Sequence, residues 1–392
     1  MQPVIIIPAF SRPDALKRLL ESVNEARFNG SDTPELIISL DGGADQKVIE
    51  IADAFEFKHG IKRVIKREEN LGLDNHILWC GDQSQKYGSI ILLEDDIYVD
   101  KYFYEYARKA IQFYQDDKRI AGIALYSPKY SQITKLGFEP MRNGYSVYFK
   151  QNVCTWGQSW TAKQWSGFRE WYSHSDEKEI DKNDAIPKTV KSWKSWDKFF
   201  SAYVVDKNLY FVFPYISYST NCADPGGVHM SKGSDRFHVP LSAKERPERD
   251  YYFCSFDTST VKYDAFSETE AKEVYDSLNI SSADLDIDIY GIKPMSLLKK
   301  KYVLTSKKCK HPIQVFRLGF RPVEKIVMYP VTDYQPGSYN RNFVYLAETE
   351  NILAEKRPFF EQVNYASYYQ TENKFYFRRY LLNTLRKYTK FI

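Results

Sequence analysis

Strand-like and helix-like segments alternate along the first half of this 392-residue chain, and this alternation restricts its possible folds more than any other feature. Short apolar runs of the kind found in buried strands are separated by segments whose apolar residues recur at helical spacing. The expected strands are residues 4–7, 36–40, 61–65 and 89–93. Strict alternation at this spacing predicts an α/β fold, in which helices flank both faces of a mostly parallel, Rossmann-like sheet.

Three of these expected strands end in polar segments. The segments are residues 8–12, Asp41-Gly42-Gly43 and Glu94-Asp95-Asp96. Because the carboxyl ends of parallel strands meet at one edge of a sheet, ligands of such folds bind there. We therefore expect the three segments to contribute to one binding site.

The acidic triplet Glu94-Asp95-Asp96 follows four apolar residues, so its carboxylates would stand at the tip of a rigid strand. Carboxylate oxygens are preferred ligands of Mn²⁺ and Mg²⁺, which also bind phosphate oxygens and water. A cation held there would neutralise the charge that grows on a diphosphate leaving group. The alternative interpretation of the triplet is a solvated acidic turn.

The remainder of the chain has weaker patterns. Residues 217–233 are rich in glycine and serine and are typical of a loop. Beyond residue 245, three aspartates alternate with apolar residues, which predicts a strand with one acidic face; they are Asp284, Asp286 and Asp288. We expect a catalytic domain at residues 1–240 and a C-terminal extension at residues 241–392, which would contact the acceptor or a membrane.

Residues 374–392 carry six basic and no acidic side chains, interleaved with phenylalanine and leucine. Such a segment can lie on an anionic membrane surface. It can equally be a helix that packs on its own domain and turns a basic face to water. The first interpretation predicts a peripheral contact with the inner face of a membrane.

Composition argues against several classes of function. The net charge of +4 is too small to indicate binding to nucleic acid. Five widely spaced cysteines without a CxxC pair argue against a disulfide framework or a zinc knuckle and suit the cytoplasm. The apolar N-terminus has no basic leader or cleavage site, so it is interpreted as a strand rather than a signal peptide. An aromatic content of 16% suits stacking on sugars and equally suits an aromatic core.

The order of these motifs resembles that of the GT-A glycosyltransferases. It is similar in particular to the N-acetylglucosaminyltransferase I group, whose metal motif is also Glu-Asp-Asp after an apolar strand, and to bacterial family 2-like glycosyltransferases. Each short motif is weakly specific, whereas their order and spacing together are specific. The resemblance extends to about residue 240 through residues 3–12, 39–43, His76, 93–96, 196–197, 214–217 and 227–229.

The resemblance implies a UDP-sugar donor and a role for each matching residue. Arg12, Asp41 and His76 match residues that hold the uracil end of the donor. Glu94 and Asp95 match residues that orient its sugar and ribose. Asp96 matches the direct ligand of Mn²⁺ or Mg²⁺, and Asp197 matches the general base. His229 stands where the relatives have a serine, and it could approach the metal. The full donor-binding set is Pro8, Arg12, Asp41, His76, Glu94 and Asp95.

Each of these residues also has an ordinary structural interpretation. Asp41 can be a turn aspartate, His76 a histidine on a helix surface, and Arg12 an exposed residue of a first helical turn. Asp197 at the start of a helix is favoured by the helix dipole whatever its function. Trp196 can stack on a sugar or pack in the core.

The sequence therefore predicts the inverting transfer of a sugar from a UDP-sugar to a hydroxyl of a glycan or lipid-linked glycan, in the cytoplasm and in the assembly of bacterial surface polysaccharides. A sugar nucleotidyltransferase is an alternative, although residues 8–12 lack the glycine that such enzymes place after the first strand. A non-catalytic glycan-binding protein that uses its 31 tyrosines and 7 tryptophans is the other alternative.

Overall fold

The computed structural model of the chain describes residues 2–29, 33–224, 237–241, 251–317, 320–332 and 343–353. The chain divides into two compact units. The first consists of Met1–Lys129 and Arg142–Ser267, and the second of Tyr130–Met141 and Glu268–Ile392. The division into a catalytic domain at residues 1–240 and an extension at residues 241–392 stays a prediction. The function of the C-terminal extension stays a prediction.

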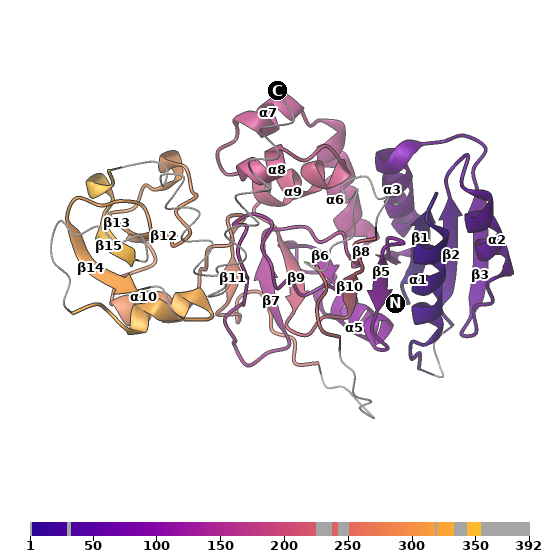
Figure 1. Ribbon diagram of the computed structural model, residues 1–392, viewed down its shortest axis with the longest axis horizontal. Helices are drawn as coiled ribbons and strands as arrows, with labels where there is room; N and C mark the ends of the chain where they lie inside the picture. The colour runs from indigo at the N-terminus through magenta and orange to yellow at the C-terminus, as the bar shows by residue number, and fades with distance from the viewer. Residues whose placement is uncertain are drawn as a thin grey trace, which may run out of the picture. The chain divides into compact units, whose positions relative to one another are not determined.

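The first unit is built on a nine-stranded sheet (Figure 1). Its strands are β1 (Val4–Ala9), β2 (Glu35–Leu40), β3 (Ile61–Lys66), β4 (Ser89–Leu92), β6 (Ile120–Ala124), β7 (Val147–Lys150), β8 (Gln158–Thr161), β9 (Tyr210–Pro214) and β11 (Lys262–Tyr263). They lie in the order β11-β7-β9-β6-β8-β4-β1-β2-β3. The four predicted strands are β1 to β4, which pair in parallel, whereas β8 runs antiparallel to β4 and β6. The predicted α/β class with a mostly parallel sheet is confirmed.

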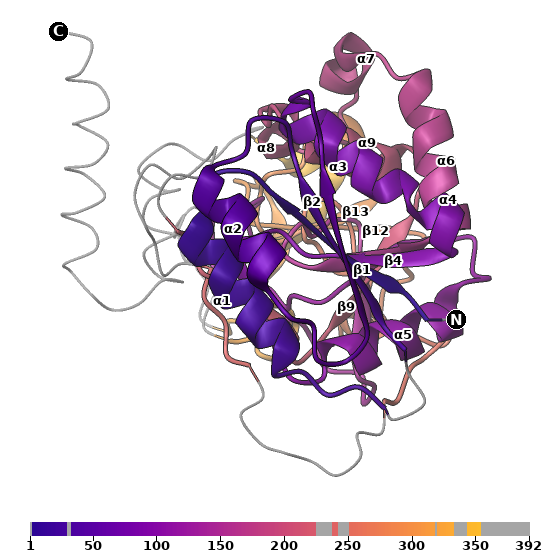
Figure 2. The same ribbon diagram turned by 90° about the vertical axis from the view of Figure 1, so that its right-hand side faces the viewer.

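Helices cover both faces of this sheet, with α1 and α2 on one side and α3, α4 and α6 on the other (Figure 2). The predicted apolar face of the first helix is buried, since Leu16, Leu19, Leu20 and Val23 are each at most 1% exposed. The helices of the first unit are α1 (Pro13–Asn24), α2 (Gln46–Ala54), α3 (Gly72–Asp82), α4 (Ser84–Tyr87), α5 (Phe103–Tyr114), α6 (Ala162–Ser173), α7 (Glu177–Lys182), α8 (Lys188–Lys191) and α9 (Trp196–Asp206).

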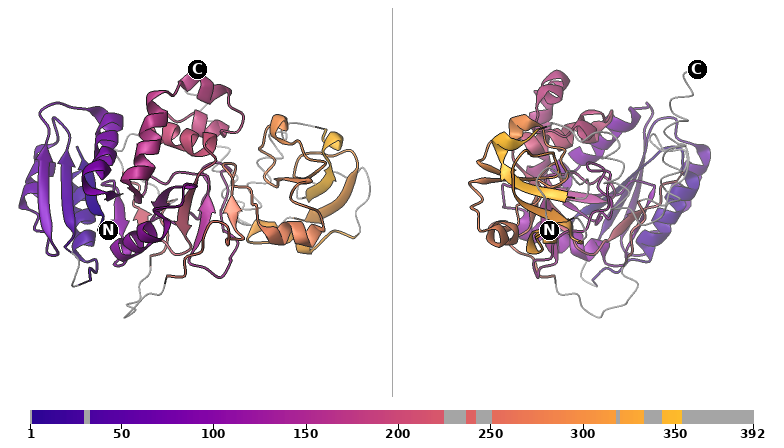
Figure 3. Two further views of the ribbon diagram at one scale, coloured as in Figure 1. Left: turned by 180° about the vertical axis from the view of Figure 1, so that it is seen from behind. Right: turned by 60° about the vertical axis from the view of Figure 1, so that its left-hand side comes forward.

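The tryptophan-rich middle of the chain is part of the core. Trp160 and Trp165 are fully buried and stack with ring centroids 4.6 Å apart. Gly81 of α3 lies against the Trp165 ring so closely that a Cβ atom there would come within 2.0 Å of it. Helices α6 and α9, drawn in pink in Figure 3, are held to the sheet by aromatic contacts of this kind, in which Phe200 packs against Trp160, Trp165 and Phe211. Much of the high aromatic content therefore stabilises the fold.

A separate two-stranded sheet includes the residues that directly follow the acidic triplet. β5 (Ile97–Val99) begins one residue after Asp96 and pairs antiparallel with β10 (Ser219–Asn221). This pairing brings residues Cys222 and Asp224 beside the triplet, although they are distant in sequence. Among the helices that the structure describes, none has the length and apolar character needed to cross a lipid bilayer.

The second unit contains a separate four-stranded sheet in the order β12-β13-β15-β14. Its elements are α10 (Lys272–Leu278), β12 (Leu285–Asp288), η1 (Met295–Leu297), β13 (Tyr302–Thr305), β14 (Pro312–Arg317), η2 (Val323–Met328), β15 (Phe343–Glu348) and η3 (Thr349–Asn351). β12 pairs in parallel with β13, and the other two pairings are antiparallel. The basic segment at residues 374–392 lies outside the described residues.

The three alternating aspartates predicted to form an acidic strand face have different environments. Asp284 is exposed, and Asp286 accepts hydrogen bonds from the backbone N–H groups of Lys299 (2.7 Å) and Lys300 (2.9 Å). Asp288 is fully buried and forms an ion pair with the equally buried Lys307. The carboxylates of Asp286 and Asp288, both in β12, therefore have structural partners.

Replacing Lys307 by methionine is expected to lower the free energy of unfolding by about 3–5 kcal/mol, because it leaves the buried Asp288 carboxylate without its counter-charge. Urea denaturation of the full chain measures the loss. The matched control is Lys272→Met, which removes an exposed ion pair with Asp276 in the same unit and is expected to change little. The double variant Asp288→Leu/Lys307→Met should recover most of the stability. A loss in Lys307→Met no larger than in the control would contradict a stabilising role for the pair.

Candidate active site

The carboxyl ends of β1, β2 and β4 surround a cavity of about 260 Å³. The polar segments that follow these strands meet there, as the sequence predicted, together with the start of α3. All six residues of the predicted donor-binding set line it. The lining is Pro8, Ala9, Phe10, Ser11, Arg12, Asp41, Asn70, Gly72, Leu73, His76, Ile77, Glu94 and Asp95.

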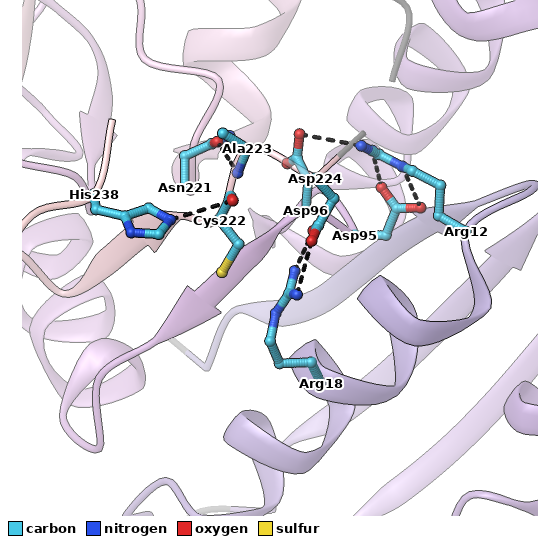
Figure 4. A network of polar contacts seen from close by, with 9 residues as sticks. All are labelled: Arg12, Arg18, Asp95, Asp96, Asn221, Cys222, Ala223, Asp224 and His238. Atoms are coloured by element: carbon cyan, nitrogen blue, oxygen red, sulfur yellow. Dashed lines mark hydrogen bonds and ion pairs between the residues drawn. The ribbon is translucent and has the colours of Figure 1, made fainter. Parts of the chain in front are cut away.

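Arg12 connects the start of α1 to the acidic triplet (Figure 4). Its guanidinium forms a bidentate ion pair with Asp95, in which Nε lies 3.2 Å from Oδ2. Nη1 also donates to Oδ2 of Asp96 over 3.3 Å. The side chain is only 19% exposed, so Arg12 is not the exposed helical residue of the alternative interpretation.

The carboxylates of the triplet lie close enough together to disfavour full ionisation. Burial raises the pKa of Glu94 well above its usual range, and the charges of Asp96, Asp95 and Asp197 raise it further. Burial likewise raises the pKa of Asp95 to about 6, although Arg12 opposes this shift. A cation bound here would relieve the repulsion between these groups. The effect of Asp197 on Glu94 also indicates that the predicted base lies near the triplet.

Asp96 has an oxygen suited to a cation. Its Oδ1 atom is buried and has no hydrogen-bond partner among the described residues, whereas its backbone carbonyl accepts from the N–H of Cys222 over 2.8 Å. Within the described residues, no group of three or more His, Cys, Asp or Glu side chains is arranged to hold a metal ion. Asp96 therefore fits a cation that takes its other ligands from phosphate oxygens and water. His229 lies outside the described residues.

Asp41 organises the wall of the cavity opposite the triplet. The carboxylate is buried and accepts from three backbone N–H groups, those of Gly42 (3.0 Å), Leu71 (2.9 Å) and Gly72 (3.1 Å). A Cβ atom on Gly42 would lie 2.1 Å from the backbone of Glu69, so only glycine permits this close approach. A carboxylate has about four acceptor positions, so Asp41 retains capacity on Oδ2 for an N–H of a ligand.

His76 is buried on α3 and is not a surface histidine. Its Nε2 atom lies 2.8 Å from the hydroxyl oxygen of Ser39 at the end of β2. Burial lowers the pKa of His76 to about 4, and the nearby Arg67 lowers it as well, while Asp41 acts in the opposite direction. The imidazole is therefore neutral near pH 7, so it would meet a ligand as a neutral hydrogen-bonding group.

Asp197 lies in the first turn of α9 and accepts a hydrogen bond of 2.6 Å from the hydroxyl of Ser195. Its neighbour Trp196 is 3% exposed and packs among aromatic rings that include Trp165 and Phe200. Trp196 therefore belongs to the core and offers no free face to a sugar. Asp197 itself is half-buried, as expected of a group that must reach a bound substrate.

Residues 4–167 match the family model described as glycosyl transferase family 2. This region of the chain is therefore similar to the family 2 glycosyltransferases. Together with the sheet order, the match confirms the predicted GT-A fold class. The matched range contains all the residues that line the cavity, whereas Asp197 follows this range in the chain. A comparison with curated protein sequences found no match.

Some solved structures have a distant likeness to this chain. A structure of residues 1–349 of TarS from S. aureus in complex with UDP-GlcNAc is 14% identical, with a TM-score of 0.38, and the match covers 59% of this chain and 61% of that one. The mannosyltransferase PcManGT from Pyrobaculum calidifontis, in complex with GDP-Man and Mn²⁺, is 8% identical, with a TM-score of 0.30, and the match covers 41% and 45% of the two chains. The chain thus spans less than two thirds of the length of each of these two solved chains. Likenesses this distant do not identify a donor.

The surroundings of the candidate site also contain residues that the sequence did not predict. Arg18 of α1 forms a bidentate ion pair with Asp224, with 3.0 Å between Nη1 and Oδ1 (Figure 4). Ser39 holds His76, and Asp74 accepts from the backbone N–H of Trp196 over 3.0 Å. These residues have no local sequence signal, because each acts through a partner that is distant in the chain. Residues 225–233 of the predicted loop lie outside the described residues.

Acidification is expected to destabilise the glycosyltransferase fold through His76. The unfolded chain protonates this histidine below about pH 6.5, whereas the folded chain does so only near pH 4. Between these values the unfolded state binds more protons at this histidine, so the contribution of His76 to stability falls as the pH falls, by up to roughly 3 kcal/mol. Denaturant unfolding at several pH values measures the slope of the free energy of unfolding against pH. The slope should shrink in His76→Asn and persist in the exposed control His174→Asn; equal slopes in both variants would exclude His76 as the cause.

Proposed function

We propose that this chain is an inverting, metal-dependent glycosyltransferase that moves a sugar from a UDP-sugar to a hydroxyl of a glycan or lipid-linked glycan. One observation carries the proposal: the cavity at the carboxyl edge of the sheet brings the six predicted donor-binding residues together, with Asp96 next to them. The family match to residues 4–167 supports the same class of reaction.

The donor would bind with its uracil toward Asp41 and the neutral His76, and with its diphosphate toward the triplet. Burial raises the pKa of Glu94 and so favours its protonated form, which would donate a hydrogen bond to a sugar hydroxyl. Asp95 would orient the ribose and sugar. Mn²⁺ or Mg²⁺, when bound at Asp96, would supply positive charge for the departing diphosphate.

Asp197 would accept the proton of the acceptor hydroxyl. The acceptor oxygen then forms a bond to the anomeric carbon of the donor as the bond from that carbon to the phosphate oxygen breaks. UDP leaves with the electron pair of the broken bond, and the configuration at the anomeric carbon is inverted. The hydrogen bond from Ser195 fixes the orientation of the Asp197 carboxylate before the acceptor binds.

Release of UDP from a panel of UDP-sugars, measured with purified full chain in Mn²⁺ and in EDTA, tests the proposal. We expect UDP release that depends on the metal and is accelerated by glycan acceptors. Formation or consumption of pyrophosphate would instead indicate a sugar nucleotidyltransferase. Glycan binding without turnover of any nucleotide sugar would indicate a non-catalytic binding protein.

The place of action is a further part of the proposal. We expect the chain to act in the cytoplasm, at the inner face of a membrane, in the assembly of surface polysaccharide. The basic segment at residues 374–392 motivates this expectation. Flotation of the chain with anionic vesicles tests it, since a variant lacking residues 374–392 should lose the binding and retain UDP release. Equal flotation of both chains would exclude the segment as the membrane contact.

A further inference from the structure

One hydrogen bond joins the helix that lines the donor cavity to the helix that carries the proposed base. α3 contributes Gly72, Leu73, His76 and Ile77 to the cavity. Asp74 lies in the same first turn, and its Oδ1 atom accepts from the backbone N–H of Trp196 over 3.0 Å. Trp196 is the first residue of α9, and the two bonded residues are 122 positions apart in the chain.

This bond replaces a cap that α9 lacks. The first N–H groups of a helix have no partner within the helix, and a side chain at the N-cap usually satisfies one of them. Ser195 holds the N-cap position of α9 but accepts no hydrogen bond from a helix N–H, and its hydroxyl donates to Asp197. The start of α9 is consequently held by Asp74 from another helix, and Ser195 is free to orient the carboxylate of Asp197.

We infer that Asp74 is a positioning residue, which sets the distance between the bound donor and the Asp197 carboxylate. The inference rests on the proposed function. Asp74 does not line the cavity and need not touch either substrate. It acts by tying the turn that contains Leu73 and His76 to the turn that contains Asp197. A donor that orders the start of α3 would thereby also order the start of α9.

The expected result of Asp74→Ala is a fall of about 10- to 100-fold in kcat for transfer, since a displacement of roughly 1 Å in a reacting group can cost about 10²-fold. The affinity for UDP should stay within about two-fold, because the residues of the cavity remain in place. Asp74→Asn keeps an Oδ1 acceptor for the Trp196 N–H, so it should restore most of the rate. A residue with only a structural role would not lower kcat and at the same time leave the affinity for UDP unchanged.

The matched control is Asp176→Ala, which removes the side-chain cap of α7 in the same unit, where Asp176 accepts from the N–H of Lys178 over 2.8 Å. Both alanine variants should lose comparable stability, about 0.5–2 kcal/mol for a helix cap, but only Asp74→Ala should lose kcat. Equal kcat in the two alanine variants, or no recovery in Asp74→Asn, would overturn the inference.

A second measurement separates this inference from the proposed function. Hydrogen exchange at the amides of residues 195–198 should accelerate in Asp74→Ala and return toward the wild-type rate in Asp74→Asn. This readout requires no turnover. Absence of UDP release by the wild-type chain would therefore refute the proposed function alone, whereas unchanged exchange in Asp74→Ala would refute the link between the two helices.

Discussion

Replacing Asp197 by asparagine is expected to lower the rate of sugar transfer by about 10²–10⁴-fold, the usual contribution of a general base. Asparagine has nearly the same shape and can still accept the 2.6 Å hydrogen bond from Ser195, but it cannot take a proton from the acceptor. UDP affinity should therefore be unchanged. The rate follows from UDP release with a saturating acceptor, and the affinity from calorimetry.

The control for this substitution lies at the other end of the same helix. Asp206→Asn also replaces a carboxylate of α9 and can keep the hydrogen bond that Asp206 accepts from the indole N–H of Trp171 (2.9 Å). It should transfer sugar at nearly the wild-type rate. If Asp197→Asn retained a tenth of the activity, the base would have to be another residue.

Replacing Asp96 by alanine should remove metal-dependent turnover, with a loss of roughly 10³-fold, because a bound metal supplies several kcal/mol of charge stabilisation in the transition state. Calorimetric titration of Mn²⁺ in the presence of UDP provides a measurement that does not depend on activity. Wild-type chain should bind the ion, and Asp96→Ala should bind it much more weakly.

Asp53→Ala is a suitable comparison for Asp96→Ala. Asp53 is a carboxylate of α2 in the same domain, where it forms an exposed ion pair with Lys66 (2.6 Å). Its loss should leave both Mn²⁺ binding and turnover intact. Near-normal activity in Asp96→Ala would exclude Asp96 as the metal ligand and would leave the buried, unpaired Oδ1 atom without a function.

Local patterns predicted the elements that hold the site. The apolar runs that became β1 to β4 and the helical spacing of Leu16 and Leu19 depend on residues close together in the chain, so the sequence alone reveals them. The acidic triplet was found for the same reason, since it directly follows an apolar strand. The resemblance to the GT-A glycosyltransferases added Asp41 and His76, which local pattern could not separate from a turn and a surface residue.

The paired residues could not be predicted in this way. Asp74 meets Trp196, Arg18 meets Asp224, and Asp288 meets Lys307 only after the strands and helices have packed. A carboxylate has the same local pattern whether it caps a helix, pairs with an arginine or lies in solvent. Its partner is chosen by the topology of the sheet, which adjacent residues do not encode.

A mostly parallel α/β sheet with polar groups at the carboxyl ends of its strands follows from local patterns, because hydrophobic periodicity and strand-terminal residues are visible in neighbouring residues. The packed fold was needed to show which of those groups line one cavity, that His76 is neutral, that Trp196 belongs to the core, and that Asp74 holds the start of the helix of Asp197. Burial and long-range contact set these properties, since they alone determine how much water and which charges surround a side chain.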